Sequence, residues 1–249
     1  MLFDEGFLRK LESLRLAVRR SISGRREGER LTKRRGGSSD FTSHRSYTQG
    51  DEFRAIDWNL YGRLGMLYVK EFTREEALSV RLSIDTSPSM APKFQFAQRL
   101  GAALALVADH EAPSMPLPEI ENLKLGATYT VPTVPRGLAI LVSDLWDEGL
   151  KAQIQRIRAE TAVIHVLSPQ ELEPPLSGKL RLVDSESGES VVRFVGEEER
   201  SAYRRLLAEY CASWKRWCFD REINYLRCSS ATPLEDVVQV YLREAGVLD

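Results

Sequence analysis

The stretch LSVRLSIDTSPSM, residues 78–90, decides the fold, because an apolar run ends at Asp85 and a short polar turn follows it. Apolar residues then recur at every third or fourth position from Phe94 to Ala108. This spacing is typical of an amphipathic helix. The sequence therefore predicts a buried strand, a loop and a helix in that order.

The same pattern returns further along the chain. An apolar run from Leu138 to Val142 ends at Ser143 and Asp144, and helical spacing follows through Ile157. Ala162–Leu167 is a further buried strand. Strands that alternate with helices predict an α/β fold of the Rossmann-like class, with an open, mainly parallel sheet and helices on both faces. The remaining predicted elements are a β-hairpin (Leu180–Val183 and Val191–Val195), a long helix (Glu197–Phe219), a strand (Ile223–Cys228) and a terminal helix (Pro233–Ala245).

The sequence before this domain divides into three parts. Residues 1–22 contain an N-terminal helix, expected from Leu2 to about Val18, and residues 23–45 form a basic loop rich in Gly, Ser and Arg. We expect this loop to be a solvated linker rather than a nucleic-acid site, since no aromatic residues are interleaved with the charges. Residues 46–77 are expected to pack on the main domain, which covers 78–249.

Composition excludes several classes of protein. The 249 residues include 35 basic and 36 acidic side chains, so no overall charge favours nucleic acid or an anionic membrane. No apolar run approaches the roughly 20 residues that span a bilayer. Met1 is followed by an acidic, polar stretch rather than a secretory signal, and the three cysteines form no metal-ligand pattern. We therefore expect a cytoplasmic protein.

Polar side chains gather where two predicted strands end. Asp85 and Asp144 each follow one of the predicted strands, and Ser87 and Ser89 alternate along the turn after Asp85. Oxygen ligands of this kind suit a hard divalent cation, with Mg²⁺ or Mn²⁺ favoured over Ca²⁺. Alternatively, the two hydroxyls cap the amides at the start of the helix. A second carboxylate at the same end of the sheet favours the metal.

This arrangement resembles the metal-dependent adhesion site of von Willebrand factor A domains, in which Asp-x-Ser-x-Ser follows a buried strand and a later strand ends in Ser-Asp-Leu. A narrower resemblance comes from residues 46–58, SYTQGDEFRAIDW, and residues 67–72, LYVKEF. These segments are similar to the bacterial family called domain of unknown function 58, whose members resemble partners of MoxR-type AAA+ ATPases.

The resemblance implies specific roles for site residues. Asp85, Ser87 and Ser89 would be metal ligands, and Asp144 would be a ligand or an acceptor behind the ligands. Thr128 is the candidate for the remaining ligand, with Thr130 and Thr133 as alternatives. The stretch 110–137 is shorter than the family pattern, so a helix and a strand are expected to be missing or abbreviated there. Such a loss would weaken metal binding or leave a vestigial site.

Two further features have both a structural and a functional interpretation. The charged pairs and Trp58 in residues 50–58 could form a partner surface, but a packed junction with Trp58 as a buried anchor is favoured. His165 lies inside a buried strand and is expected to be a core histidine rather than a ligand.

These observations predict a binding module rather than an enzyme. No Gly-x-x-x-x-Gly-Lys-Ser/Thr loop is present, so ATPase activity would belong to a partner. The resemblance implies an adaptor that acts with a MoxR-type AAA+ ATPase on protein clients in chaperone-like complex assembly. The alternatives are a metal-dependent phosphoesterase, which lacks an evident general base, and a scaffold whose site no longer binds metal.

Overall fold

A computed structural model describes residues 3–14, 16, 39–51, 53–74, 80–109, 116–126, 129–135, 137–147, 149–184 and 188–248. The chain divides into two compact units, one formed by Met1–Arg20 with Leu78–Asp249 and the other by Ser21–Ala77. We refer to them as the sheet unit and the small unit.

The sheet unit is built on four parallel strands in the order β3-β4-β5-β8. Their bounds are Val80–Ile84, Leu138–Ser143, Glu160–Leu167 and Asn224–Ser229. β4 is buried along its whole length and β5 along nearly all of it, as continuous apolar runs covered on both faces require. The prediction of an α/β fold with an open parallel sheet is confirmed.

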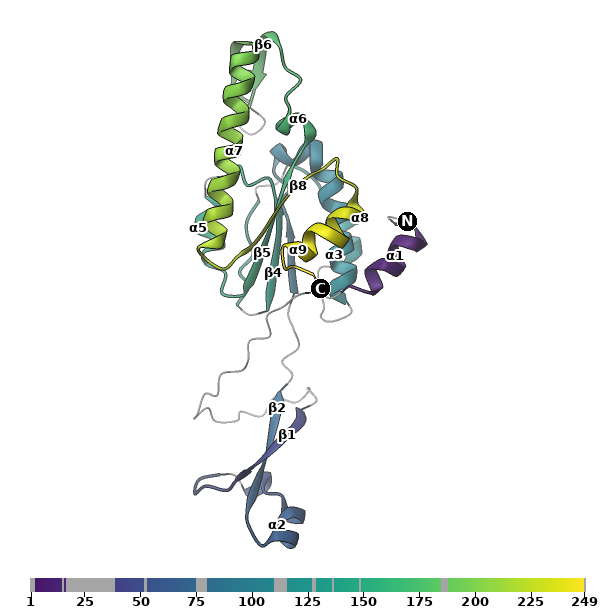
Figure 1. The fold of residues 1–249 in the computed structure, drawn as a ribbon, viewed down its shortest axis with the longest axis vertical. Coiled ribbons are helices and arrows are strands. Elements are labelled where there is room, and N and C mark those ends of the chain that lie inside the picture. The colour runs from purple at the N-terminus through teal and green to yellow at the C-terminus, as the bar shows by residue number, and fades with distance from the viewer. Residues whose placement is uncertain are drawn as a thin grey trace. The chain divides into compact units, whose positions relative to one another are not determined.

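Helices cover both faces of this sheet (Figure 1). One face packs against α1 (Glu5–Glu12), α3 (Phe94–Asp109) and the C-terminal helical segment, which consists of α8 (Leu234–Asp236), the π-helical turn η3 (Val237–Tyr241) and α9 (Leu242–Glu244). The other face packs against α5 (Leu150–Ile154), α7 (Glu197–Phe219) and Val131. Two apolar layers therefore hold the strand ends in fixed positions.

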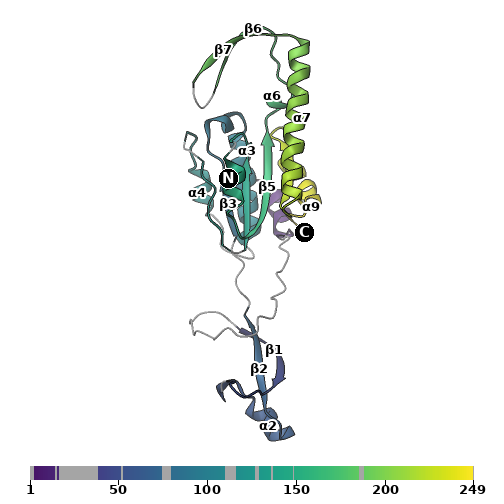
Figure 2. The same ribbon diagram turned by 90° about the vertical axis from the view of Figure 1, so that its left-hand side faces the viewer.

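Two antiparallel strands project from this unit. β6 (Gly178–Val183) and β7 (Ser190–Val195) form the predicted hairpin, which follows α6 (Pro169–Leu172) and extends beyond the end of β5 (Figure 2). Most of its apolar side chains are exposed, with Phe194 at 68% and Val183 at 61%. None of the helices in the described part of the chain combines the length and hydropathy needed to cross a membrane.

The small unit contains β1 (Ser39–Ser46) paired with β2 (Tyr68–Arg74), together with η1 (Phe53–Ala55) and α2 (Trp58–Leu64). Asp57 caps α2 by accepting hydrogen bonds from the amides of Asn59 and Leu60, and it also contacts His44 Nε2 at 2.9 Å. Arg45 forms a two-pronged ion pair with Asp51, and the hydrogen bonds from Arg45 hold the pKa of that carboxyl well below its usual range.

Several boundaries differ from prediction. The basic loop was expected to reach residue 45, but Ser39–Ser46 is β1, because pairing with β2 supplies the backbone hydrogen bonds that a strand requires. The remainder of that loop, to residue 38, lies outside the described residues. Helix α1 is shorter than the predicted span of Leu2–Val18. Residues 116–126 and 129–135 contain only the short helix α4 (Leu117–Glu121), in agreement with an abbreviated middle region.

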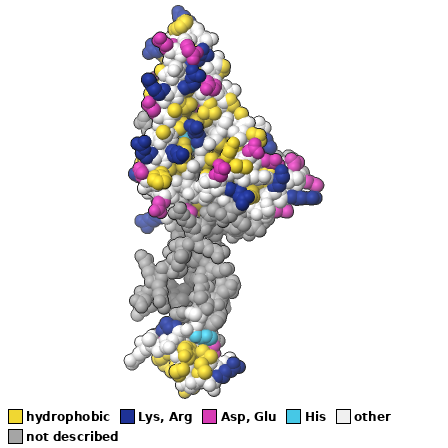
Figure 3. Space-filling view, viewed as in Figure 1, with side chains coloured by type: hydrophobic (Ala, Val, Ile, Leu, Met, Phe, Trp, Pro, Cys, Tyr) yellow, Lys and Arg dark blue, Asp and Glu magenta, His cyan; other side chains and the backbone are white. Residues whose placement is uncertain are grey.

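Trp58 is not the buried anchor that was expected. Its side chain is 57% exposed, and its ring packs edge-on against Tyr61. The charged pairs predicted in residues 50–58 do stabilise local structure, but their partners lie within the small unit. Exposed apolar side chains gather on this unit (Figure 3), namely Phe53, Trp58, Tyr61, Leu64 and Met66. The packing of residues 46–77 on the main domain stays a prediction.

Candidate functional site

The candidate site lies where β3 and β4 end. Asp85 follows β3 and Asp144 follows β4, and the parallel register pairs Ile84 with Val142. The Asp85 amide donates to the Val142 carbonyl at 2.8 Å, which continues the ladder by one residue. Both carboxyl groups are consequently held at the same end of the sheet, with Asp85 3% exposed and Asp144 1% exposed.

The Asp85 carboxylate is fixed by two short contacts. Its Oδ1 accepts a hydrogen bond from the Ser87 amide at 2.8 Å, and its Oδ2 accepts one from Ser143 Oγ at 2.5 Å. Ser143 Oγ in turn accepts from the Leu145 amide at 2.9 Å. Leu145 has a φ of 61°, an uncommon value for a residue with a branched side chain, at the turn that carries Asp144. The two strand ends are thus joined through Ser143.

The hydroxyls of Ser87 and Ser89 contact each other in the turn that follows Asp85. Their Oγ atoms are 3.0 Å apart, and Ser89 is close enough to Asp144 to act against the rise in the pKa of that carboxyl. Ser87 stands at the N-cap position of η2 (Pro88–Lys93), but its hydroxyl caps no amide. The helix-cap alternative is therefore not what the structure shows for Ser87. Asp85, Ser87, Ser89 and Asp144 form one cluster, which we call the Asp85 cluster.

The threonine predicted to complete the site is not placed. Thr128 lies outside the described residues, and the alternatives Thr130 and Thr133 are exposed. Tyr129, the next residue after Thr128, lies close to the cluster. Burial raises the pKa of its hydroxyl, and the nearby charge of Asp85 raises it further.

Lys93 is a member of the site that the sequence analysis missed. It ends η2 with its side chain fully buried, and its Nζ lies 3.0 Å from Asp144 Oδ2 and 2.5 Å from Glu171 Oε1. The contact with Asp144 is an ion pair without good hydrogen-bond geometry, since Oδ2 makes no hydrogen bond among the described residues. The clue in the sequence was a lysine at helical spacing between Met90 and Ala97, both of which are buried.

Glu171 was also missed, because it lies far from Asp85 in sequence. It belongs to a capping box with Ser168 at the start of α6, and it accepts a hydrogen bond from Trp146 Nε1 at 3.2 Å. Burial acts to raise its pKa, but hydrogen bonds from Lys93 and from the Ser168 amide outweigh burial and lower it. Glu171 is therefore held as a carboxylate beside the buried ammonium.

Burial dominates the electrostatics of Asp144. The pKa of Asp144 is raised by loss of solvent, while Lys93 and Ser89 act in the opposite direction and the negative charge of Asp85 adds to the rise. Two carboxyl groups close enough to affect each other favour a cation between them. The described residues contain no group of three or more His, Cys, Asp or Glu side chains suited to a metal, so any ion here must rely on hydroxyls as well.

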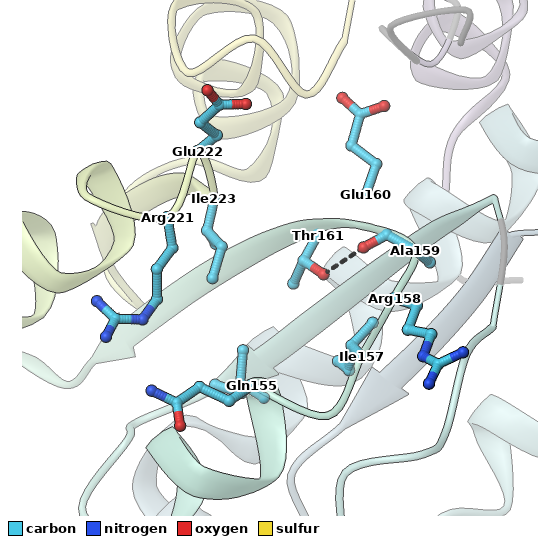
Figure 4. A pocket seen from close by; sticks show the side chains of 10 residues that line it. Gln155, Ile157, Arg158, Ala159, Glu160, Thr161, Arg221, Glu222 and Ile223 are labelled. Carbon is cyan, nitrogen blue, oxygen red and sulfur yellow. Dashed lines mark hydrogen bonds between the residues drawn. The ribbon is translucent and has the colours of Figure 1, made fainter. Parts of the chain in front are cut away.

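A pocket of about 520 Å³ lies at the opposite end of β5, around Ala159 and Thr161 (Figure 4). The charged side chains that line it, those of Arg158, Glu160, Arg221 and Glu222, spread apart rather than converge on one point. Such a lining offers no focused set of ligands. The Asp85 cluster is the stronger candidate, because its two carboxyl groups are buried and its two serine hydroxyls contact each other.

Comparison with known proteins adds the family. The model described as "Protein of unknown function DUF58" matches residues 43–117 and 119–212, which include residues 43–77 of the small unit and the whole Asp85 cluster. The chain belongs to the DUF58 family. Similar proteins include "Uncharacterized protein Rv1480" of Mycobacterium tuberculosis and "Uncharacterized protein Mb1516" of Mycobacterium bovis, each 26% identical over 72% of this chain and 70% of its own length. No solved structure matches this DUF58 chain significantly.

Proposed function

We propose that this DUF58 chain is a protein-protein interaction module whose Asp85 cluster binds a divalent cation. Asp85, Ser87, Ser89 and Asp144 would hold the ion, with Mg²⁺ or Mn²⁺ favoured because every donor atom is oxygen. The bound ion would supply an open coordination position to a carboxylate of a partner protein.

The observation that carries the proposal is a buried carboxylate oxygen without a hydrogen bond. Asp144 Oδ2 is buried and makes no hydrogen bond among the described residues, and the two serine hydroxyls beside it face each other. This oxygen forms an ion pair with the Lys93 ammonium at 3.0 Å, and its remaining lone pair is available to a divalent ion. The donor set therefore fits a hard ion.

Binding is favoured over catalysis for a physical reason. The hydrogen bonds from Ser87 and Ser143 fix the orientation of the Asp85 carboxylate, and each of its oxygens keeps a lone pair for an ion. His165 is fully buried, and burial lowers its pKa to about 4, with the charge of Arg227 contributing. A histidine in that state is a poor proton acceptor near neutral pH.

The proposed partner is a MoxR-type AAA+ ATPase, with the module as its adaptor in the assembly of protein complexes. This part of the proposal rests on the resemblance of residues 46–58 and 67–72 to the family's sequence. It agrees with the exposed apolar side chains of the small unit, because such groups are typical of protein interaction surfaces.

Capture of a purified MoxR-type ATPase from the same organism, with and without Mg²⁺, tests the proposal. We expect capture in Mg²⁺, loss of capture with EDTA, and loss in Asp85→Ala. Asp147→Ala is the matched control, because Asp147 is an exposed carboxylate just beyond the cluster and should leave capture unchanged. Capture that persists both in EDTA and in Asp85→Ala would remove the metal-dependent mechanism.

A further inference from the structure

Lys93 places a positive charge inside the site that is proposed to bind a cation. Its side chain is 0% exposed, and its ammonium contacts only carboxylates in the contacts described, those of Asp144 and Glu171. Removing an ammonium group from water costs several kcal/mol unless nearby groups compensate it. The position is thus costly for a lysine and must be held by these two acidic side chains.

Packing alone does not explain a lysine here. Met90 and Ala97 lie on the same buried side of the helical segment, and both are 0% exposed. Replacing a buried ion pair by an apolar side chain of similar size is often neutral or stabilising. Apolar side chains at Lys93, Asp144 and Glu171 together would avoid the cost of burying charge, so the retained charges need a reason.

The reason lies in what the ammonium faces. Nζ approaches Asp144 Oδ2, the same oxygen that makes no hydrogen bond and that would be offered to a divalent ion. Glu171 Oε1 lies closer to Nζ, at 2.5 Å, than Asp144 Oδ2 does, at 3.0 Å. The ammonium is therefore shared between one carboxylate of the Asp85 cluster and one outside it.

We propose that Lys93 is an internal cation that competes with the divalent ion for Asp144, and that Glu171 weakens this competition by drawing the ammonium toward itself. The inference rests on the proposed function, since it concerns the affinity of the same site. When all four groups are ionised, the carboxylates of Asp85, Asp144 and Glu171 exceed the ammonium by two negative charges. Removing the charge of Lys93 makes the site more negative, whereas removing the charge of Glu171 makes it less negative.

Two substitutions give opposite expectations for Mg²⁺ affinity. Lys93→Met keeps the length of the side chain and removes its charge, so Mg²⁺ should bind about tenfold or more tightly. Glu171→Gln keeps an oxygen that can accept from the Ser168 amide and complete the capping box, but it removes the carboxylate charge and leaves the ammonium to Asp144. Mg²⁺ should then bind about tenfold more weakly.

Isothermal titration with Mg²⁺ measures these affinities on the full chain, and thermal unfolding in EDTA and in Mg²⁺ provides a second readout. Lys93→Met should have a lowered Tm in EDTA and a larger rise on addition of Mg²⁺ than the natural protein. Lys10→Met is the matched control, because Lys10 pairs with Glu235 on the exposed surface. The Lys10→Met protein should bind Mg²⁺ as tightly as the natural protein. If Lys93→Met does not fold, Glu171→Gln still tests the inference.

The outcomes separate this inference from the proposed function. Mg²⁺ binding to Lys93→Met but not to the natural protein would support the competition and overturn metal-dependent function. Binding of equal strength in the natural protein, Lys93→Met and Glu171→Gln would overturn the competition and leave the proposed function standing. Absence of binding in all variants would overturn both.

Discussion

Ser143 shows how a single hydroxyl joins two strands of the sheet. Its Oγ donates to Asp85 Oδ2 and accepts from the Leu145 amide, so it connects the end of β3 with the turn after β4. Both contacts are buried. The hydroxyl therefore holds the two aspartates of the Asp85 cluster at their observed separation.

Ser143→Ala should lower the free energy of unfolding by about 2 to 3 kcal/mol, because it leaves a buried carboxylate oxygen and a buried amide without a partner. Denaturant unfolding of the purified variant measures this value. Ser213→Ala is the control, since Ser213 is exposed and its hydroxyl bonds only to the Tyr210 carbonyl, and it should change stability by less than about 0.5 kcal/mol. If Ser143→Ala also lowers the free energy of unfolding by less than about 0.5 kcal/mol, Ser143 does not act as a bridge between the two strand ends.

At this scale the sequence located some members of the site and not others. Asp85, Ser87 and Ser89 could be found because they follow one strand within five residues. Asp144 could be found because it ends the next strand of the same kind. Lys93 and Glu171 could not be linked beforehand, since 78 residues separate them and only the fold of α6 beside η2 brings them together.

Helix α3 and strand β3 pack so closely that a side chain at one position between them requires a neighbour to shift. A Cβ atom placed on Gly101 would lie 2.4 Å from Ile84 Cδ1, and Ile84 is the residue directly before Asp85. Glycine normally weakens a helix relative to alanine, so the close approach of the strand explains its presence. The position of α3 over β3 is thus linked to the position of the site.

Gly101→Ala should destabilise the sheet unit by about 1 to 2 kcal/mol, because overpacking outweighs the gain in helix propensity. Ile84→Val removes the Cδ1 atom and by itself should cost about 1 kcal/mol. The double variant should be less destabilised than the sum of the single changes, since the clash is gone. Strict additivity in denaturant unfolding would show that the two residues do not interact.

For the whole molecule, His165 links stability to pH. It is buried on β5, its Nδ1 lies 2.8 Å from the Tyr225 hydroxyl, and burial lowers its pKa from 6.5 to about 4. The unfolded chain therefore takes up a proton on this residue at a higher pH than the folded protein does. The contribution of neutral His165 to the stability of the folded protein is fully present above pH 6.5 and is lost as pH falls toward 4.

Asp144 acts in the opposite sense. Its pKa is raised in the folded protein, mainly by burial, so the folded state holds this proton more tightly and the contribution of Asp144 to stability declines as pH rises. The pH profile of the natural protein combines both effects. A substitution at His165 is required to separate them.

The natural protein should lose on the order of 3 kcal/mol of stability through His165 between pH 6.5 and 4, and His165→Phe should lack this loss. Tryptophan fluorescence in a Trp58→Phe background reports the sheet unit, because the other three tryptophans lie there. Tyr225→Phe removes the hydroxyl partner but keeps the imidazole, so its profile should parallel that of the natural protein. An unchanged slope in His165→Phe would show that His165 does not titrate as described.

The sequence by itself determined the α/β class, the order of the parallel strands along the chain, the hairpin and the helix Glu197–Phe219, because these depend on local hydrophobic periodicity. It also located Asp85 and Asp144 at strand ends, since parallel strands finish at one edge of a sheet. Only the tertiary structure decided that Lys93 enters the site, that Glu171 meets it and that Trp58 is exposed. Such contacts depend on which elements become neighbours in space, and periodicity along the chain carries no information about that.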